Sequence, residues 1–292
     1  SSIYRVYDLE QRRQVSIQGI AGEEKRSALG QVVTVFSTKG GVGKSTIAVN
    51  LAACLSQEFG FSVALVDLDL QFGDVAVLLN MTPRQTISDL AVEYNQLDEE
   101  LLDAYLMRHS SGVRVLAAPA RPEYAEMVSS HHVEKVIKLL QKSYDYIIID
   151  TPGIFTDPSM VALDYAHQIL LVLSLDLPTL KNIKLGLEVL DSLHHRDKVK
   201  IVLNRANLEL GIGPGDVERS LGVSLLSQLP SDGRLVVGSV NKGKPFILSN
   251  PHSRISDSLR QLAREVVSTG QKTRSVKKPR RFLGGLLSAL TQ

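Results

Sequence analysis

One glycine-rich segment constrains this chain more than any other feature. Residues 38–46 read Thr-Lys-Gly-Gly-Val-Gly-Lys-Ser-Thr, directly after an apolar run at 32–36 and directly before a helical pattern at 47–52. A strand, a tight turn and a helix N-terminus in this order direct backbone N–H groups into one concavity, which favours an anion. Glycine lets the backbone approach phosphate closely because no Cβ intervenes. The order therefore predicts a phosphate-binding loop in an α/β fold.

Two side chains of this loop carry the expected chemistry. Lys44 would reach the β- and γ-phosphates of a nucleotide, and the Ser45 hydroxyl would ligate Mg²⁺. The loop and the start of the helix would bind the nucleotide through Gly40, Gly41, Val42, Gly43, Lys44, Ser45 and Thr46. The alternative is a plain glycine-rich turn with two solvated lysines. The agreement of strand, loop and helix favours the phosphate site.

Short apolar runs alternate with helical patterns from residue 31 to about residue 270. Candidate strands lie at 32–36, 62–67, 113–117, 146–150, 169–174, 199–203 and 224–227. Apolar runs of this length suit strands buried on both faces, and their alternation with helices indicates right-handed βαβ units. The sequence predicts one α/β domain at 31–270, with a doubly wound, mostly parallel sheet and helices on both faces. Residues 1–30 are expected to form a polar N-terminal arm or linker, and 271–292 a tail.

Carboxylates follow two of the predicted strands. Asp67 and Asp69 end the strand at 62–67, and Asp150 ends the strand at 146–150. Since ligands of open α/β sheets bind at the carboxyl ends of the strands, we expect these acids near the phosphate loop. Asp150 would hold Mg²⁺, through water. Solvated acids in strand-terminating turns are the alternative, and Asp74 suits a helix N-cap as well as a catalytic role.

The loop departs from the ordinary phosphate-binding pattern, because Thr38 stands where glycine is usual and Lys39 follows it. The run Lys-Gly-Gly-Val-Gly-Lys-Ser-Thr resembles the deviant P-loop of the ParA/MinD superfamily of ATPases, and the resemblance covers residues 31–268. It implies ATP and Mg²⁺ as cofactors, a homodimer that sandwiches ATP, and slow, partner-stimulated hydrolysis to ADP and phosphate. It also implies that Lys39 contacts the nucleotide of the partner copy, that Asp69 positions the attacking water, and that Asp67 lies close to Mg²⁺.

Two later segments complete the nucleotide site by the same resemblance. The strand at 199–203 is followed by Asn204 and Arg205, and the family uses that Asn amide to read adenine. An amide can pair a donor and an acceptor with a base edge. Pro230 and Asp232 match the family's loop after the last core strand, which borders adenine. A plain turn at the end of the strand is the alternative for Asn204.

The amino-acid sequence of residues 67–90 is similar to that of the CpaE/TadZ group of pilus-assembly ATPases. This resemblance implies a role in placing a type IV or Tad pilus machine at the inner membrane. That group often carries a receiver-like domain upstream, and about thirty residues precede the loop here. The alternatives are a MinD-like division-site ATPase, a ParA-like partition ATPase that uses the nucleoid, and a nucleotide-dependent scaffold that does not hydrolyse ATP.

The end of the chain combines bases with an apolar stripe. Residues 266–292 contain no acid, and their six Lys and Arg leave a net charge of −4 on the rest of the +2 chain. Four of these bases are Lys277, Lys278, Arg280 and Arg281. The apolar residues that follow share one helical face and are Phe282, Leu283, Leu286, Leu287 and Leu290. The pairing predicts an interfacial helix on an anionic membrane, similar to the membrane-targeting helix of MinD. A solvated end, a helix docked on a partner protein and a non-specific DNA contact remain alternatives.

Composition limits the other classes of function. The chain lacks Trp and has only 5% aromatic residues, which argues against an aromatic platform for nucleic acid. The single cysteine, Cys54, excludes a disulfide within the chain and falls on the apolar pattern of a helix. No signal peptide and no apolar run of about 18 residues is present. The expected location is the cytoplasm, peripheral on the inner face of the cell membrane.

Overall fold

The computed structural model describes residues 29–206 and 213–276. Its strands are β1 (Gln31–Phe36), β2 (Val63–Asp67), β3 (Met107–Arg108), β4 (Arg114–Leu116), β5 (Tyr146–Asp150), β6 (Gln168–Leu173), β7 (Val199–Asn204) and β8 (Leu225–Leu229). Its α-helices are α2 (Lys44–Gln57), α3 (Val75–Leu78), α4 (Ile87–Val92), α5 (Glu99–Tyr105), α6 (Ser130–Ser143), α7 (Asp157–Tyr165), α8 (Leu177–Ser192), α9 (Pro214–Leu221), α10 (Gly233–Asn241), α11 (Phe246–Ser249) and α12 (Arg254–Val276). The membrane-tail residues predicted at 277–290 lie outside the described ranges.

The strands form a single sheet in the order β3-β4-β2-β5-β1-β6-β7-β8. Every pairing is parallel except that of β3 with β4. The chain moves from β1 towards one edge through β2 and later towards the other edge through β6, so the strand order reverses at β1. The predicted α/β fold with a mostly parallel sheet is confirmed.

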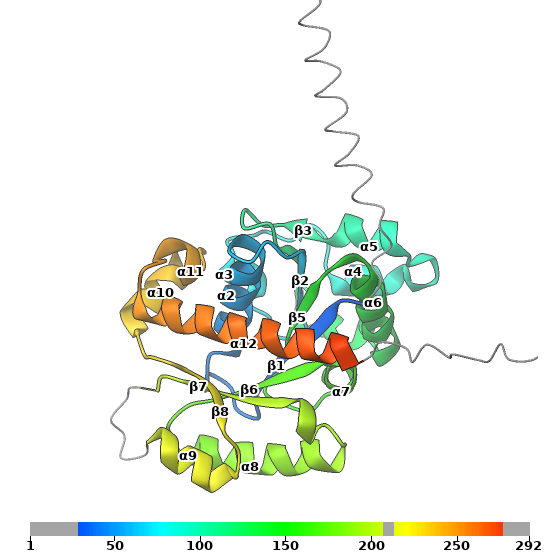
Figure 1. Ribbon diagram of the computed structural model, residues 1–292. Helices are drawn as coiled ribbons and strands as arrows, with labels where there is room; N and C mark the ends of the chain where they lie inside the picture. Colours follow the sequence, from blue (N-terminus) through cyan, green and yellow to red (C-terminus); the bar gives the residue numbers. More distant parts are fainter. Residues whose placement is uncertain (1–28, 207–212, 277–292) are drawn as a thin grey trace, which may run out of the picture.

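Alternate residues of the central strands face opposite layers of helices. Val33 and Val35 of β1 pack in one apolar cluster with residues of α2, α11 and α12. Val32 packs in a second cluster with residues of α4, α5 and α6, and Phe36 in a third with residues of α8 and α9. Figure 1 shows α12 and the pair α8 and α9 on different sides of the sheet. Helices therefore cover both faces, which explains why the strands read as unbroken apolar runs.

The long helix α12 packs against α2 and β8. The Gln168 side-chain amide of β6 donates to the Val266 carbonyl of this helix, at 2.9 Å. Cys54 is buried in α2, as its apolar setting predicts. Within the described ranges, no helix has both the length and the apolar character needed to span a bilayer.

The fold brings the predicted site residues to one edge of the sheet. The strands β1, β2, β5, β6 and β7 are parallel, so their carboxyl ends meet at the same edge. Asp67 lies directly opposite Asp150 in the register of β2 with β5. This edge, at the point where the strand order reverses, is where open α/β sheets bind ligands.

Candidate nucleotide-binding site

The glycine-rich loop joins the end of β1 to the first turn of α2. Gly41 and Gly43 adopt positive φ values of 75° and 97°, a conformation that side chains with a Cβ rarely adopt. Gly43 is also the N-cap of α2, and no side chain caps this helix terminus. The first N–H groups of a helix have no partner within the helix, so here they are available to an anion. A Cβ added at Gly40 or Gly41 would meet no atom within 4 Å, so the loop has space beside it for a ligand.

Asp150 is fully buried, with an exposed fraction of 0%. Among the described residues, no group reaches full hydrogen-bond geometry with either of its side-chain oxygens, although the Ser45 hydroxyl and the Thr151 N–H lie close enough to lower its pKa. Burial raises the pKa of Asp150, while the Ser45 hydroxyl and the Lys44 ammonium act in the opposite direction. A buried carboxylate is unfavourable in its charged form unless a cation neutralises it or it takes up a proton. Two carboxylate oxygens close to a serine hydroxyl form a donor set that suits Mg²⁺.

Asp67 is satisfied by backbone groups instead. Its two carboxylate oxygens accept hydrogen bonds from the N–H groups of Asp69 and Val75, each at 3.1 Å. Burial and the neighbouring Asp150 raise the pKa of Asp67. A Cβ at Gly73 would collide with this carboxylate. Asp67 therefore shapes the loop that presents Asp69, and its predicted proximity to Mg²⁺ stays a prediction.

Asp69 is only half-buried, and one of its oxygens accepts a hydrogen bond from the Phe72 N–H at 3.3 Å. Its charge acts on the pKa of Asp150, which places the two acids in one electrostatic environment. Asp74 occupies the N-cap position of α3 but makes no side-chain cap hydrogen bond. Asp69 is therefore positioned beside the buried carboxylates, at the mouth of the site.

Lys39 contacts α8 of its own chain. The Lys39 ammonium lies 3.5 Å from an oxygen of Asp176, whose side chain is 37% exposed. Asp176 is the N-cap of α8 and accepts hydrogen bonds from the Thr179 N–H at 2.9 Å and from the Ser174 hydroxyl at 2.7 Å. Burial opposes ionisation, but the hydrogen bond from the Thr179 hydroxyl, together with those from the Ser174 hydroxyl and the Thr179 N–H and the charge of Lys39, lowers the pKa of Asp176 to about 2. The deviant lysine is thus held by an anionic helix cap at the rim of the site.

Two glycines from other elements pack against the loop. A Cβ at Gly153, after β5, would lie 3.2 Å from the backbone nitrogen of Gly40. A Cβ at Gly186, in α8, would lie 2.5 Å from the Thr38 methyl group. Thr38, the residue that replaces the usual glycine, therefore fits because α8 has no side chain at that point.

Sequence reasoning missed Asp176 and Gly186. The run Ser174-Leu175-Asp176-Leu177-Pro178 carries a detectable signal, since an N-cap acid followed by proline marks a helix start directly after a strand. No local signal assigns Gly186 to the loop, because the contact joins residues far apart in the chain.

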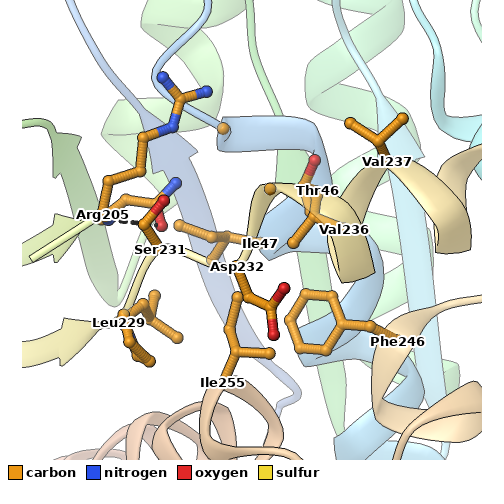
Figure 2. A pocket seen from close by; sticks show the side chains of 14 residues that line it. Thr46, Ile47, Arg205, Leu229, Ser231, Asp232, Val236, Val237, Phe246 and Ile255 are labelled. Atoms are coloured by element: carbon orange, nitrogen blue, oxygen red, sulfur yellow. Dashed lines mark hydrogen bonds between the residues drawn. The ribbon is translucent and has the colours of Figure 1, made fainter. Parts of the chain in front are cut away.

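A cleft beside the loop accounts for the remaining predicted residues. Its polar lining includes Asn204, Arg205 and Asp232, and Pro230 borders it. Figure 2 shows Arg205 and Ser231 on one side of the cleft and Phe246 on the other. The apolar part is formed by Ile47, Leu229, Val236, Val237, Phe246 and Ile255. An apolar wall with a polar rim suits a planar heterocyclic base next to the phosphate loop.

Comparison with known proteins identifies the family. The model of the AAA domain family AAA_31 matches residues 30–203, more than half of the chain. The chain belongs to this family. The septum site-determining protein MinD of Thermotoga maritima is 27% identical, over 83% of this chain and 90% of that protein.

Solved structures agree with this assignment. A ParA family ATPase from Chlorobium tepidum superposes with a TM-score of 0.76 at 27% identity, covering 80% of this chain and 99% of that one. The cell division ATPase MinD of Pyrococcus furiosus gives 0.72 at 25% identity, covering 82% and 99%. The chain is therefore an ATPase of the ParA/MinD superfamily, as predicted from its loop, while the finer resemblance to CpaE/TadZ stays a prediction.

Proposed function

We propose that this chain binds Mg-ATP between two copies of itself, hydrolyses it slowly, and uses the cycle to position a cellular machine at the inner face of the cell membrane. The observation that supports this proposal most directly is the fully buried Asp150 carboxylate beside Lys44 and Ser45. A free α2 terminus for phosphate and an apolar cleft for a base adjoin it. Together they fit ATP and Mg²⁺.

Each residue of the site has a distinct part in the proposed reaction. Ser45 and Asp150 would hold Mg²⁺, which supplies positive charge that polarises the phosphates when it is bound. Lys44 and the loop amides stabilise the charge on the transferred phosphoryl group, and Asp69 orients the attacking water. Lys39 would leave Asp176 and contact the nucleotide of the other copy, because a flexible ammonium can be delivered in trans.

Phosphate release from Mg-ATP over several hours tests hydrolysis. The wild-type chain should release phosphate steadily, and an Asp69→Ala variant should lose most of that activity while still binding ATP. If the two chains release phosphate at the same background rate, the chain is a nucleotide-dependent scaffold and not an enzyme.

We propose that the tail at residues 271–292 attaches the dimer to anionic lipid. Basic residues near an anionic leaflet contribute about 1 kcal/mol each. Two tails bound together gain ~10²–10⁴ in avidity over one, so dimerisation with ATP would switch attachment on. Co-sedimentation with anionic vesicles should therefore occur with ATP and not with ADP.

A matched variant separates lipid from DNA as the partner of the tail. Replacing Leu286 and Leu287 by Asp should abolish vesicle binding, because the apolar stripe matters only for lipid. Non-specific DNA binding depends on the bases and should fall only modestly. If the chain with Asp at 286 and 287 still binds vesicles, the apolar stripe is not the lipid contact. If Lys39→Ala binds vesicles with ATP as tightly as the wild type does, attachment does not depend on dimerisation. Either result would contradict the proposed switch.

We propose that the machine positioned by this chain is a type IV or Tad pilus assembly machine. The amino-acid sequence of residues 67–90 supports this proposal. The MinD relatives favour a second candidate, placement of the division site. Deleting the gene distinguishes them. Loss or misplacement of pili with normal cell lengths would support the first, and misplaced septa with normal piliation would support the second.

A further inference from the structure

The end of β7 contacts the phosphate loop directly. The Asn204 side-chain N–H donates to the Val42 carbonyl at 2.8 Å, across 162 positions of sequence. The Arg205 guanidinium donates to the Gly41 carbonyl at 3.3 Å. Two consecutive residues of one strand end therefore hold two consecutive carbonyls of the loop.

The orientation of the Asn204 amide is fixed by partners of opposite type. Its oxygen accepts the Arg205 N–H at 2.9 Å, while its nitrogen donates to the Val42 carbonyl. A side-chain amide has two N–H groups and two lone pairs. One N–H and one lone pair thus remain for a ligand, so holding the loop and contacting a base are compatible.

The local backbone is built for this contact. Arg205 has a φ of 57°, which is rare for a residue with a Cβ, and the chain turns sharply at this point directly after β7. The strand end is anchored, because the Ala206 N–H donates to the Leu229 carbonyl of β8 at 2.9 Å. At Gly43, a Cβ would collide with the Asn204 nitrogen. The loop and the strand end are fitted to each other.

We infer that Asn204 and Arg205 are positioning residues that clamp the phosphate loop in its anion-binding shape, in addition to any contact they make with the base. The inference rests on the nucleotide site proposed above and deepens it. It predicts that the two residues affect binding of the phosphate chain even when no base is present.

Calorimetric titration of the full chain with Mg-ATP and with Mg-tripolyphosphate tests the clamp. Asn204→Ala and Arg205→Ala should each weaken tripolyphosphate binding by about threefold to tenfold, the range expected for one lost hydrogen bond. Asn204→Ala should weaken ATP binding further. Val237→Ala, on the apolar wall of the cleft, is the control and should weaken ATP binding only.

The outcomes separate the clamp from its alternatives. If Asn204→Ala loses affinity for ATP but binds tripolyphosphate as the wild type does, Asn204 only reads the base and the clamp is wrong. Arg205 is exposed, so its variant should keep the wild-type thermal midpoint, and unchanged tripolyphosphate binding in it would also contradict the clamp. A wild-type chain that binds neither ligand would contradict the proposed function itself.

Discussion

At the scale of single residues, charge placement explains the site. Asp67 and Asp150 lie side by side at two strand ends and are both buried. Both oxygens of Asp67 accept backbone N–H groups in full hydrogen-bond geometry, whereas no group in the described part of the chain reaches that geometry with the oxygens of Asp150. Asp67 therefore shapes a loop, and Asp150 is the acid that we propose as a ligand of the cation. A carboxylate buried this completely is unfavourable in its charged form, and a bound cation would remove that cost.

Asp150→Asn should uncouple nucleotide binding from Mg²⁺. In the wild type, chelating Mg²⁺ should weaken ATP binding by about tenfold or more, because a charge-assisted interaction is lost. The variant should bind ATP with the same reduced affinity whether or not Mg²⁺ is present, as measured by titration calorimetry. Asp191→Asn, which changes an exposed acid of α8, is the matched control and should keep the full Mg²⁺ dependence. If ATP binding by Asp150→Asn depends on Mg²⁺ as strongly as in the wild type, Asp150 does not hold Mg²⁺.

Lys44, Ser45 and Asp150 could be predicted as neighbours, because a strand, a loop and a second strand are each readable within a few positions. The structure brings the three together, and their catalytic and metal-binding roles stay predictions. The partner of Lys39 was not predictable, because Asp176 lies 137 positions away and only the folded sheet brings the two together. The clamp of the loop by Asn204 was missed for the same reason.

At the scale of elements, α8 is joined to the phosphate loop by two contacts. Its N-cap, Asp176, pairs with Lys39, and its Gly186 receives the Thr38 methyl group. Glycine within a helix is destabilising by roughly 0.5–1 kcal/mol relative to alanine. The close approach of the loop accounts for this glycine.

Gly186→Ala should therefore impair nucleotide binding despite the better helix propensity of alanine. The added Cβ would displace Thr38 and distort the loop. The double change Gly186→Ala with Thr38→Ser removes the colliding methyl and should recover ATP affinity close to that of Thr38→Ser alone. If Gly186→Ala binds ATP as tightly as the wild type does in calorimetry, the packing argument is wrong.

The charge of Asp176 should make its contribution to stability depend on pH. Its pKa is about 2 in the folded chain, below the ordinary value of 3.8, so ionised Asp176 stabilises the fold above pH 4 and this stabilisation is lost as the pH falls towards 2. Asn remains a good N-cap, so Asp176→Asn removes mainly the charge. Because the side chain is partly exposed, we expect a loss on the order of 1 kcal/mol at pH 7.

Urea denaturation at pH 7, 4 and 3 measures this effect. The difference in free energy of unfolding between wild type and Asp176→Asn should shrink as the pH is lowered. A difference that stays constant over this range would show that the charge does not contribute.

Most strands were predictable, because buried parallel strands are short apolar runs. The predicted runs at 32–36, 146–150 and 199–203 coincide with β1, β5 and β7 to within one residue. The edge strand β3 was missed because two residues are too few to show a pattern. Strand order was not predictable either, since pairing across the sheet joins segments far apart in sequence.

At the scale of the whole molecule, the described fold presents its phosphate loop, its carboxylates and the adjoining apolar cleft on one edge of the sheet. Lys39 pairs with Asp176 in this structure, and in the proposed cycle it would exchange this partner for the phosphates of a second copy. In the proposed cycle, replacing ADP by ATP would thus join two single chains into a dimer. Dimerisation is its central step, because membrane attachment and partner binding would both depend on it.

Light scattering of the Asp69→Ala chain tests this step most directly, because hydrolysis is blocked and the ATP state persists. We expect a molar mass of twice the 32.0 kDa chain with Mg-ATP and of a single chain with Mg-ADP. Adding Lys39→Ala should keep the mass at one chain with either nucleotide. A single-chain mass for Asp69→Ala under saturating Mg-ATP would contradict the account.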